Sequence, residues 1–130
     1  MLFKRNKKKE IPSASTEQKN AIVDKEKFIE EAEKLAETVD SVTGDERIKI
    51  LNRIGSLYFQ AEKIDDAIKY YENSIEENKA LGKAYTDLVK LYNIKRKQAI
   101  DEKDDEKVKY YLTKTDNLLQ LSKDVIRGRV

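Results

Sequence analysis

The feature that most constrains this fold is a pair of apolar stripes within residues 48–78. Leu51 and Ile54 recur at a helical step in the first half of the segment, and Ala67 and Tyr71 recur in the second half. A helix with one apolar stripe cannot bury that stripe alone. The sequence therefore predicts two helices that pack against each other, and it predicts that this pair packs against a further neighbour.

Small residues stand where these two helices would meet. Gly55 and Ala67 let the backbones approach, and Tyr58 and Tyr71 fill the space beside them. This spacing resembles a tetratricopeptide repeat, a helical hairpin of about 34 residues with the pattern W-x2-L-G-x2-Y, then A-x3-F, then P. In pattern order, the corresponding positions of this chain are Leu51, Ile54, Gly55, Tyr58, Ala67, Tyr71 and Lys79.

The pattern returns after residue 78 in a looser form. Tyr85, Leu88 and Tyr92 follow the first set by one repeat period, but Val89 replaces the small glycine. An insertion precedes the KVKYY motif of the next helix, so the helix before it is expected to run to about Ile100, with DEKDDE as the turn. The resemblance implies an all-α fold of about two helix-turn-helix repeats with an extra N-terminal helix and a long C-terminal helix. The expected segments of the helical domain 16–130 are 16–43 (N-terminal helix), 48–81 (first repeat), 82–115 (divergent second repeat with an insertion) and 116–128 (capping extension).

The N-terminal helix is predicted to be amphipathic, with Ala32 and Leu35 on an apolar face and glutamates on the opposite face. Gly44 is placed to end it, and Asp45 to cap the next helix. We interpret it as a helix that covers the exposed side of the first repeat. The alternatives are a detachable segment, a self-association face, or an acidic helix that occupies a basic groove of its own chain.

A disordered basic tail is predicted over residues 1–15, which contain Pro12 among small polar residues. Two apolar residues and five cations could meet an anionic membrane surface, where each cation contributes about 1 kcal/mol. The same cations could instead meet nucleic-acid phosphates, or simply be solvated. The residues of this membrane or anion tail are Leu2, Phe3, Lys4, Arg5, Lys7, Lys8 and Lys9.

Composition argues against catalysis. The chain has no histidine and no cysteine, which removes the commonest general base, the thiolate nucleophile and the usual zinc ligands. It has no glycine-rich phosphate loop, and DEKDDE lacks the register of a calcium loop. We expect no enzyme activity, cofactor or metal. No segment of the sequence is typical of a bilayer span or a secretory signal, so a cytoplasmic protein is expected, peripheral at the inner membrane face if the tail binds lipid.

The tetratricopeptide resemblance implies that the first helix of each repeat lines a concave groove for a peptide or helix of a partner protein. By register, the residues on that face are Lys49, Asn52, Ser56, Phe59, Lys83, Thr86, Lys90, Asn93 and Lys97. A basic, amide-bearing groove suits an acidic partner segment. Some family members clamp a C-terminal carboxylate with Lys and Asn, but Asp87 opposes that activity here and we do not transfer it. The alternative is that all these residues are ordinary polar surface.

Two further surfaces complete the expectations. The last helix carries an apolar face, and if that face is not fully covered, Leu118, Leu121 and Val125 offer a homodimer contact or a partner-helix site. The basic run 95–97, together with the tail, would serve a nucleic-acid-associated protein, a less well supported alternative. The main interpretation is a protein-binding adaptor or scaffold.

Overall fold

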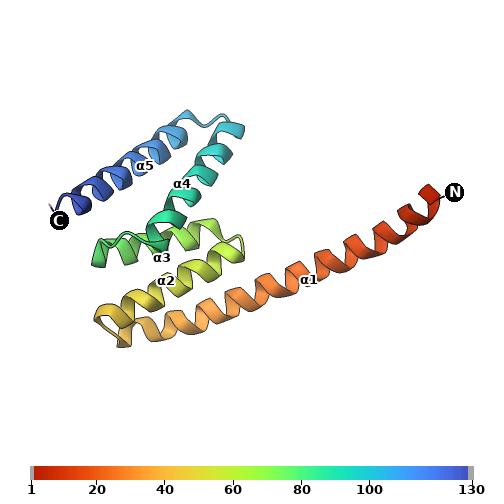
Figure 1. The fold of residues 1–130 in the computed structure, drawn as a ribbon, viewed down its shortest axis with the longest axis horizontal. Coiled ribbons are helices and arrows are strands. Elements are labelled where there is room, and N and C mark those ends of the chain that lie inside the picture. The colour runs from red at the N-terminus through yellow and green to blue at the C-terminus, as the bar shows by residue number, and fades with distance from the viewer. Residues whose placement is uncertain (1, 129–130) are drawn as a thin grey trace.

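A computed structural model describes the backbone of residues 2–128 and the side chains of residues 18–128. Within these residues the regular elements are all helices, as the sequence predicts. Their order is α1 (Leu2–Thr38), a 3₁₀ turn η1 (Val39–Ser41), α2 (Gly44–Gln60), α3 (Ile64–Asn78), α4 (Lys83–Asp101) and α5 (Asp105–Ile126). Successive helices lie side by side and run back and forth, and the N-terminal part of α1 extends away from the rest (Figure 1).

The beginning of α1 differs from the prediction. Residues 2–15, expected to be a disordered tail, continue the same helix, and no new helix starts near residue 16. Lysine, glutamate, glutamine and alanine dominate residues 7–21, and all four have high helix propensity.

The end of α1 also differs. The helix ends at Thr38 and passes through η1, and Gly44 opens α2 instead of closing α1, in the left-handed region with φ of 62°. The carbonyl groups of this corner are satisfied locally. Arg47 donates from Nη1 to the Val39 carbonyl over 2.7 Å, and the Ser41 hydroxyl donates to the Thr38 carbonyl over 2.7 Å. These bonds replace the helical hydrogen bonds lost where α1 stops.

The second hairpin matches the prediction more closely. Helix α4 runs to Asp101, a short turn follows, and Asp104 caps α5 by accepting a hydrogen bond from the Lys107 backbone N–H at 3.1 Å. The insertion therefore lengthens α4. Helix α5 continues without interruption through the whole of 105–126, so the stretch expected as a capping extension is part of one helix.

The core forms along the predicted stripes. Ala32 of α1 packs with Ile54 and Leu57 of α2 in one cluster. A second cluster joins the last three helices and includes Tyr71 of α3 and Leu91 of α4. The repeat positions Leu51, Ile54, Gly55, Ala67 and Tyr71 are all buried, as predicted.

Gly55 lies directly against the ring of Tyr71. A Cβ atom at this position would come within 2.9 Å of Tyr71 Cδ1 and 3.0 Å of Cε1. The ring is completely buried, so a side chain at Gly55 would have to displace a packed aromatic ring. The absence of a side chain at Gly55 thus sets the close approach of α2 and α3.

Gly55→Ala should therefore destabilise the protein by about 1–3 kcal/mol through overpacking, although alanine normally favours a helix. The matched control is Gly82→Ala, because a Cβ at Gly82 meets nothing within 4 Å and its backbone is extended. Urea unfolding followed by circular dichroism measures both. Equal midpoints for Gly55→Ala and the parent would contradict the close contact.

Candidate functional site

An open groove of about 370 Å³ lies between α2 and α4. It contains four of the nine residues that the sequence assigned to a partner-binding groove. Its lining residues are Ser56, Phe59, Gln60, Lys83, Asp87 and Lys90. The predicted face and this hollow therefore share four residues, and Gln60 lines the hollow in addition.

The sequence predicts that the charge of Asp87 opposes a ligand carboxylate in the groove, but the structure shows this charge paired within the protein. The Asp87 side chain is buried, and it accepts a hydrogen bond of 2.7 Å from the Tyr71 hydroxyl and forms a 3.1 Å ion pair with Lys83. The negative charge that was expected to oppose an acidic ligand is thus already compensated within the protein. Burial, and then the hydrogen bond to Asp87, raise the pKa of Tyr71, so its hydroxyl remains a donor.

Lys90 differs from Lys83, the other cation that lines the groove, in its ion pairing. Its side chain is exposed, and no carboxylate of residues 18–128 forms an ion pair with it, whereas Lys83 is engaged with Asp87. Phe59 is half-buried, because part of its ring packs on the core. Gln60 donates to Ser56 Oγ over 3.2 Å. The groove combines one free positive charge, an aromatic surface and neutral polar groups.

The other predicted groove residues lie outside this hollow. Asn52 lines a smaller hollow of about 90 Å³ beside the loop between α3 and α4, and its Oδ1 atom is buried without a hydrogen-bond partner among the described residues. Thr86 is exposed and donates its hydroxyl to the Gly82 carbonyl over 3.1 Å. Lys49 and Lys97 are exposed, and Asn93 is half-buried. The nine residues are therefore spread along two helices instead of converging on one point.

The part of α1 whose side chains the structure describes, residues 18–38, does not fill the α2–α4 groove. Phe28 and Ala32 pack on the Ile54 side of α2, and Arg53 of α2 donates to Glu31 over 2.7 Å. No residue of 18–38 lines the groove. The alternative in which the acidic helix occupies its own groove is not the state seen in this structure.

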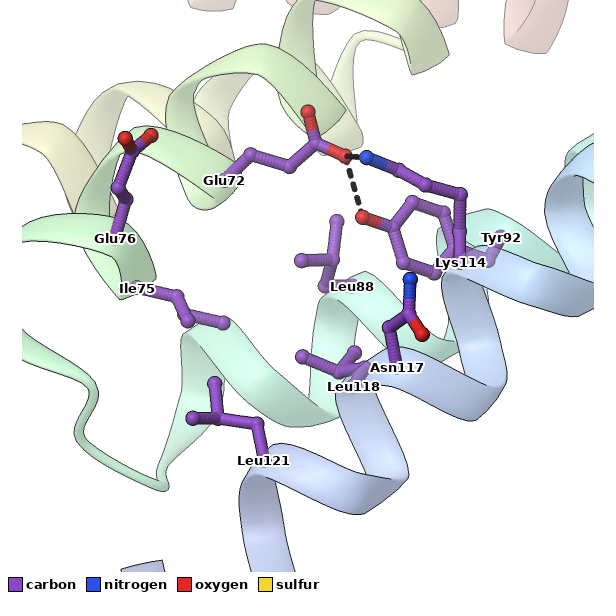
Figure 2. A pocket seen from close by; sticks show the side chains of 9 residues that line it. All are labelled: Glu72, Ile75, Glu76, Leu88, Tyr92, Lys114, Asn117, Leu118 and Leu121. Atoms are coloured by element: carbon purple, nitrogen blue, oxygen red, sulfur yellow. Dashed lines mark hydrogen bonds and ion pairs between the residues drawn. The ribbon is translucent and has the colours of Figure 1, made fainter. Parts of the chain in front are cut away.

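A second pocket, of about 270 Å³, lies between α3, α4 and α5 and was not predicted (Figure 2). Glu72 accepts a hydrogen bond from the Tyr92 hydroxyl and forms an ion pair of 3.0 Å with Lys114 at the edge of this pocket. Burial lowers the pKa of Lys114, but the hydrogen bond and charge of Glu72 outweigh that effect and raise it overall. The lining residues are Glu72, Ile75, Glu76, Leu88, Tyr92, Lys114, Asn117, Leu118 and Leu121.

This pocket corrects the expected dimer face. Leu118 is only 6% exposed and packs in the core, while Leu121 points into the pocket. Val125 is half-buried on the same side of α5. These three residues face the body of the molecule and do not form an outward contact surface.

The basic run 95–97 does not form a continuous cationic patch. Lys95 pairs with Asp65 of α3 at 2.9 Å. The Arg96 Nε atom is buried, and only Lys97 is exposed. The side chains of the N-terminal tail, Leu2 to Lys9, lie outside the described residues.

The bridge between Tyr71 and Asp87 yields a prediction. Tyr71→Phe should destabilise the protein by about 1–3 kcal/mol, because a buried carboxylate loses a hydrogen-bond donor while the ring packing is kept. Tyr110→Phe is the control, since that hydroxyl is on an exposed side chain. Thermal and urea unfolding of both variants measure the difference, and equal losses of stability would contradict the bridge.

The described residues contain no cluster of acidic side chains with metal-binding geometry and no helix apolar and long enough to cross a bilayer. In comparisons with known proteins, no family model, no curated protein and no solved structure matches the chain.

Proposed function

We propose that this protein is a binding adaptor of tetratricopeptide type, which holds an acidic peptide or helix of a partner protein in the α2–α4 groove. The observation that carries the proposal concerns Lys90, which forms no ion pair within residues 18–128 and lies in an open groove whose lining carboxylate, Asp87, is already neutralised by Lys83. The spacing of Gly55, Tyr58 and Ala67 supports the same type of protein.

The groove offers three kinds of contact to such a segment. A partner carboxylate can form charge-assisted hydrogen bonds with the Lys90 ammonium group, which are stronger than those between neutral groups. The exposed part of the Phe59 ring gives an apolar side chain a surface to pack on. Ser56 and Gln60 are neutral and can hydrogen-bond a peptide backbone. The open shape favours a shallow contact with a peptide over the enclosure of a small molecule.

A charge-reversal experiment tests this groove. The probe is a set of fluorescent decapeptides of equal apolar content, either rich in Asp and Glu or rich in Lys. The protein should prefer the acidic set, and Lys90→Glu should weaken that binding about tenfold, a change of about 1.4 kcal/mol. The matched control is Lys27→Glu on the exposed side of α1, which changes net charge equally. Equal loss in both variants, or a preference for basic peptides, would rule out the groove.

The proposal also includes peripheral attachment to the inner membrane face through the basic N-terminal segment. Five cations within residues 1–9, with Leu2 and Phe3, are the sequence basis for it. The nucleic-acid alternative has less support, because Lys95 is paired and Arg96 is partly buried. Membrane attachment needs only the N-terminal segment, whereas nucleic-acid binding would also need the basic run 95–97 in the folded body of the protein.

Vesicle flotation tests the attachment. The full chain should float with vesicles containing anionic lipid and not with neutral ones, and rising salt should release it. A variant that lacks residues 1–15 should lose this binding but still bind acidic peptides. Single-stranded RNA is the parallel probe. Steep, salt-dependent RNA binding without vesicle binding would favour the nucleic-acid alternative.

A further inference from the structure

Helix α5 carries an exposed apolar stripe, distinct from the side of the helix formed by Leu118, Leu121 and Val125. Leu112 is 40% exposed, Leu119 is 42% exposed and Ile126 is 76% exposed. They are spaced seven residues apart, about two turns, so they follow one side of the helix. We call these three residues the α5 stripe.

The α5 stripe faces away from α3. Lys114, Leu118 and Leu121 mark the side of α5 that lines the pocket with α3. At about 100° per residue, Leu112 and Leu119 lie well around the helix from Lys114 and Leu121. In the described part of the chain the stripe remains uncovered, and α5 is the last helix of the array (Figure 1).

Two charged residues run beside the stripe. Asp116 and Lys123 are both exposed, both lie on its outer flank, and neither forms an ion pair within residues 18–128. They are also seven residues apart, so they too share one side of the helix. Thr115 and Ser122 border the stripe on its other flank and are small enough to let another helix approach.

We propose that the α5 stripe is the interface of a homodimer in which two α5 helices pack antiparallel around a two-fold axis at Leu119. This arrangement places Leu119 against Leu119 of the second copy, and Leu112 against Ile126 of the second copy at both ends. The interface is self-complementary, as two-fold symmetry requires.

Charge selects this arrangement. Antiparallel packing centred on Leu119 brings Asp116 of each copy beside Lys123 of the other, so two opposite-charge pairs form. Parallel packing in register would place these residues of the two copies on opposite flanks of the interface, so no Asp116–Lys123 pair would form. Charge complementarity therefore favours the antiparallel arrangement. The alternation of the two charges around Leu119 therefore identifies a second copy of this chain as the occupant.

The dimer should be weak, because a contact between single helices buries much less surface than a typical stable interface. Its formation should therefore depend on protein concentration. It leaves the α2–α4 groove untouched, since α5 contributes no residue to that groove. A dimer would then carry two grooves, and a partner with two acidic segments could bind both.

Single-cysteine cross-linking tests the symmetry axis. The chain has no cysteine, so Leu119→Cys introduces one thiol per copy. On the axis, two such residues come within the Cα distance of about 4.4–6.8 Å that a disulfide needs. Mild oxidation of the full-length variant should give a covalent dimer. Leu112→Cys is the control, because its two copies would lie about 20 Å apart along the helices. Cross-linking of Leu112→Cys but not of Leu119→Cys would overturn the proposal.

Sedimentation of the full chain tests the contact without cross-linking. A monomer–dimer equilibrium should appear at concentrations up to about 1 mM, the weak end of specific binding. Leu119→Glu should abolish it, whereas Ile100→Glu, at an exposed isoleucine on α4, should not. A parent chain that stays monomeric, or a Leu119→Glu variant that still dimerises, would overturn the proposal.

A charge exchange tests the antiparallel register. Asp116→Lys and Lys123→Asp should each weaken the dimer several-fold, because each leaves two like-charge contacts. The variant with both substitutions should restore dimerisation, since the pairs are re-formed with their signs exchanged. Failure of the double variant to recover would overturn the antiparallel arrangement, and circular dichroism checks that all three variants remain helical.

Discussion

The close contact between Gly55 and the Tyr71 ring is the constraint on which the rest of this structure depends. It fixes the distance between α2 and α3, and it holds the tyrosine so that its hydroxyl reaches Asp87 of α4. Asp87 in turn engages Lys83 at the edge of the groove. A packing requirement at one glycine thus propagates to a third helix and decides which cation of the groove stays free. Burial of the ring is what gives this contact its rigidity.

The first hairpin could be predicted because its signal is local. Gly55 and Ala67 mark the helix contact by size alone, and the stripes around them set which faces are buried. The role of Asp87 could not be predicted in the same way. Sequence spacing placed its carboxylate on the groove face, but nothing in the sequence shows that the hydroxyl of Tyr71, on a different helix, lies 2.7 Å away. The net charge offered to a ligand depends on such tertiary contacts.

Helix α5 shows a different limit of sequence reasoning. It is apolar on two sides, one through Leu118 and Leu121 and one through Leu112 and Leu119. Helical periodicity identifies both stripes, but it does not say which one packs inward. The choice is made by α3 and α4, which cover Leu118 and leave Leu119 exposed. A shift of one residue turns the helix by about 100°, so this choice moves the exposed surface from one side of α5 to another.

The groove and the α5 stripe are two separate surfaces, and each would support only weak binding by itself. An open groove with one unpaired cation, Lys90, gives a partner few contacts, and exposed charge pairs contribute only about 0–1 kcal/mol each. A weak helix contact between two copies would likewise be marginal by itself. Because the two surfaces share no residue, a bivalent acidic partner that fills both grooves would also hold the two α5 helices together, and the α5 contact would raise the effective concentration of the second groove. By linkage, each of these weak contacts then strengthens the other.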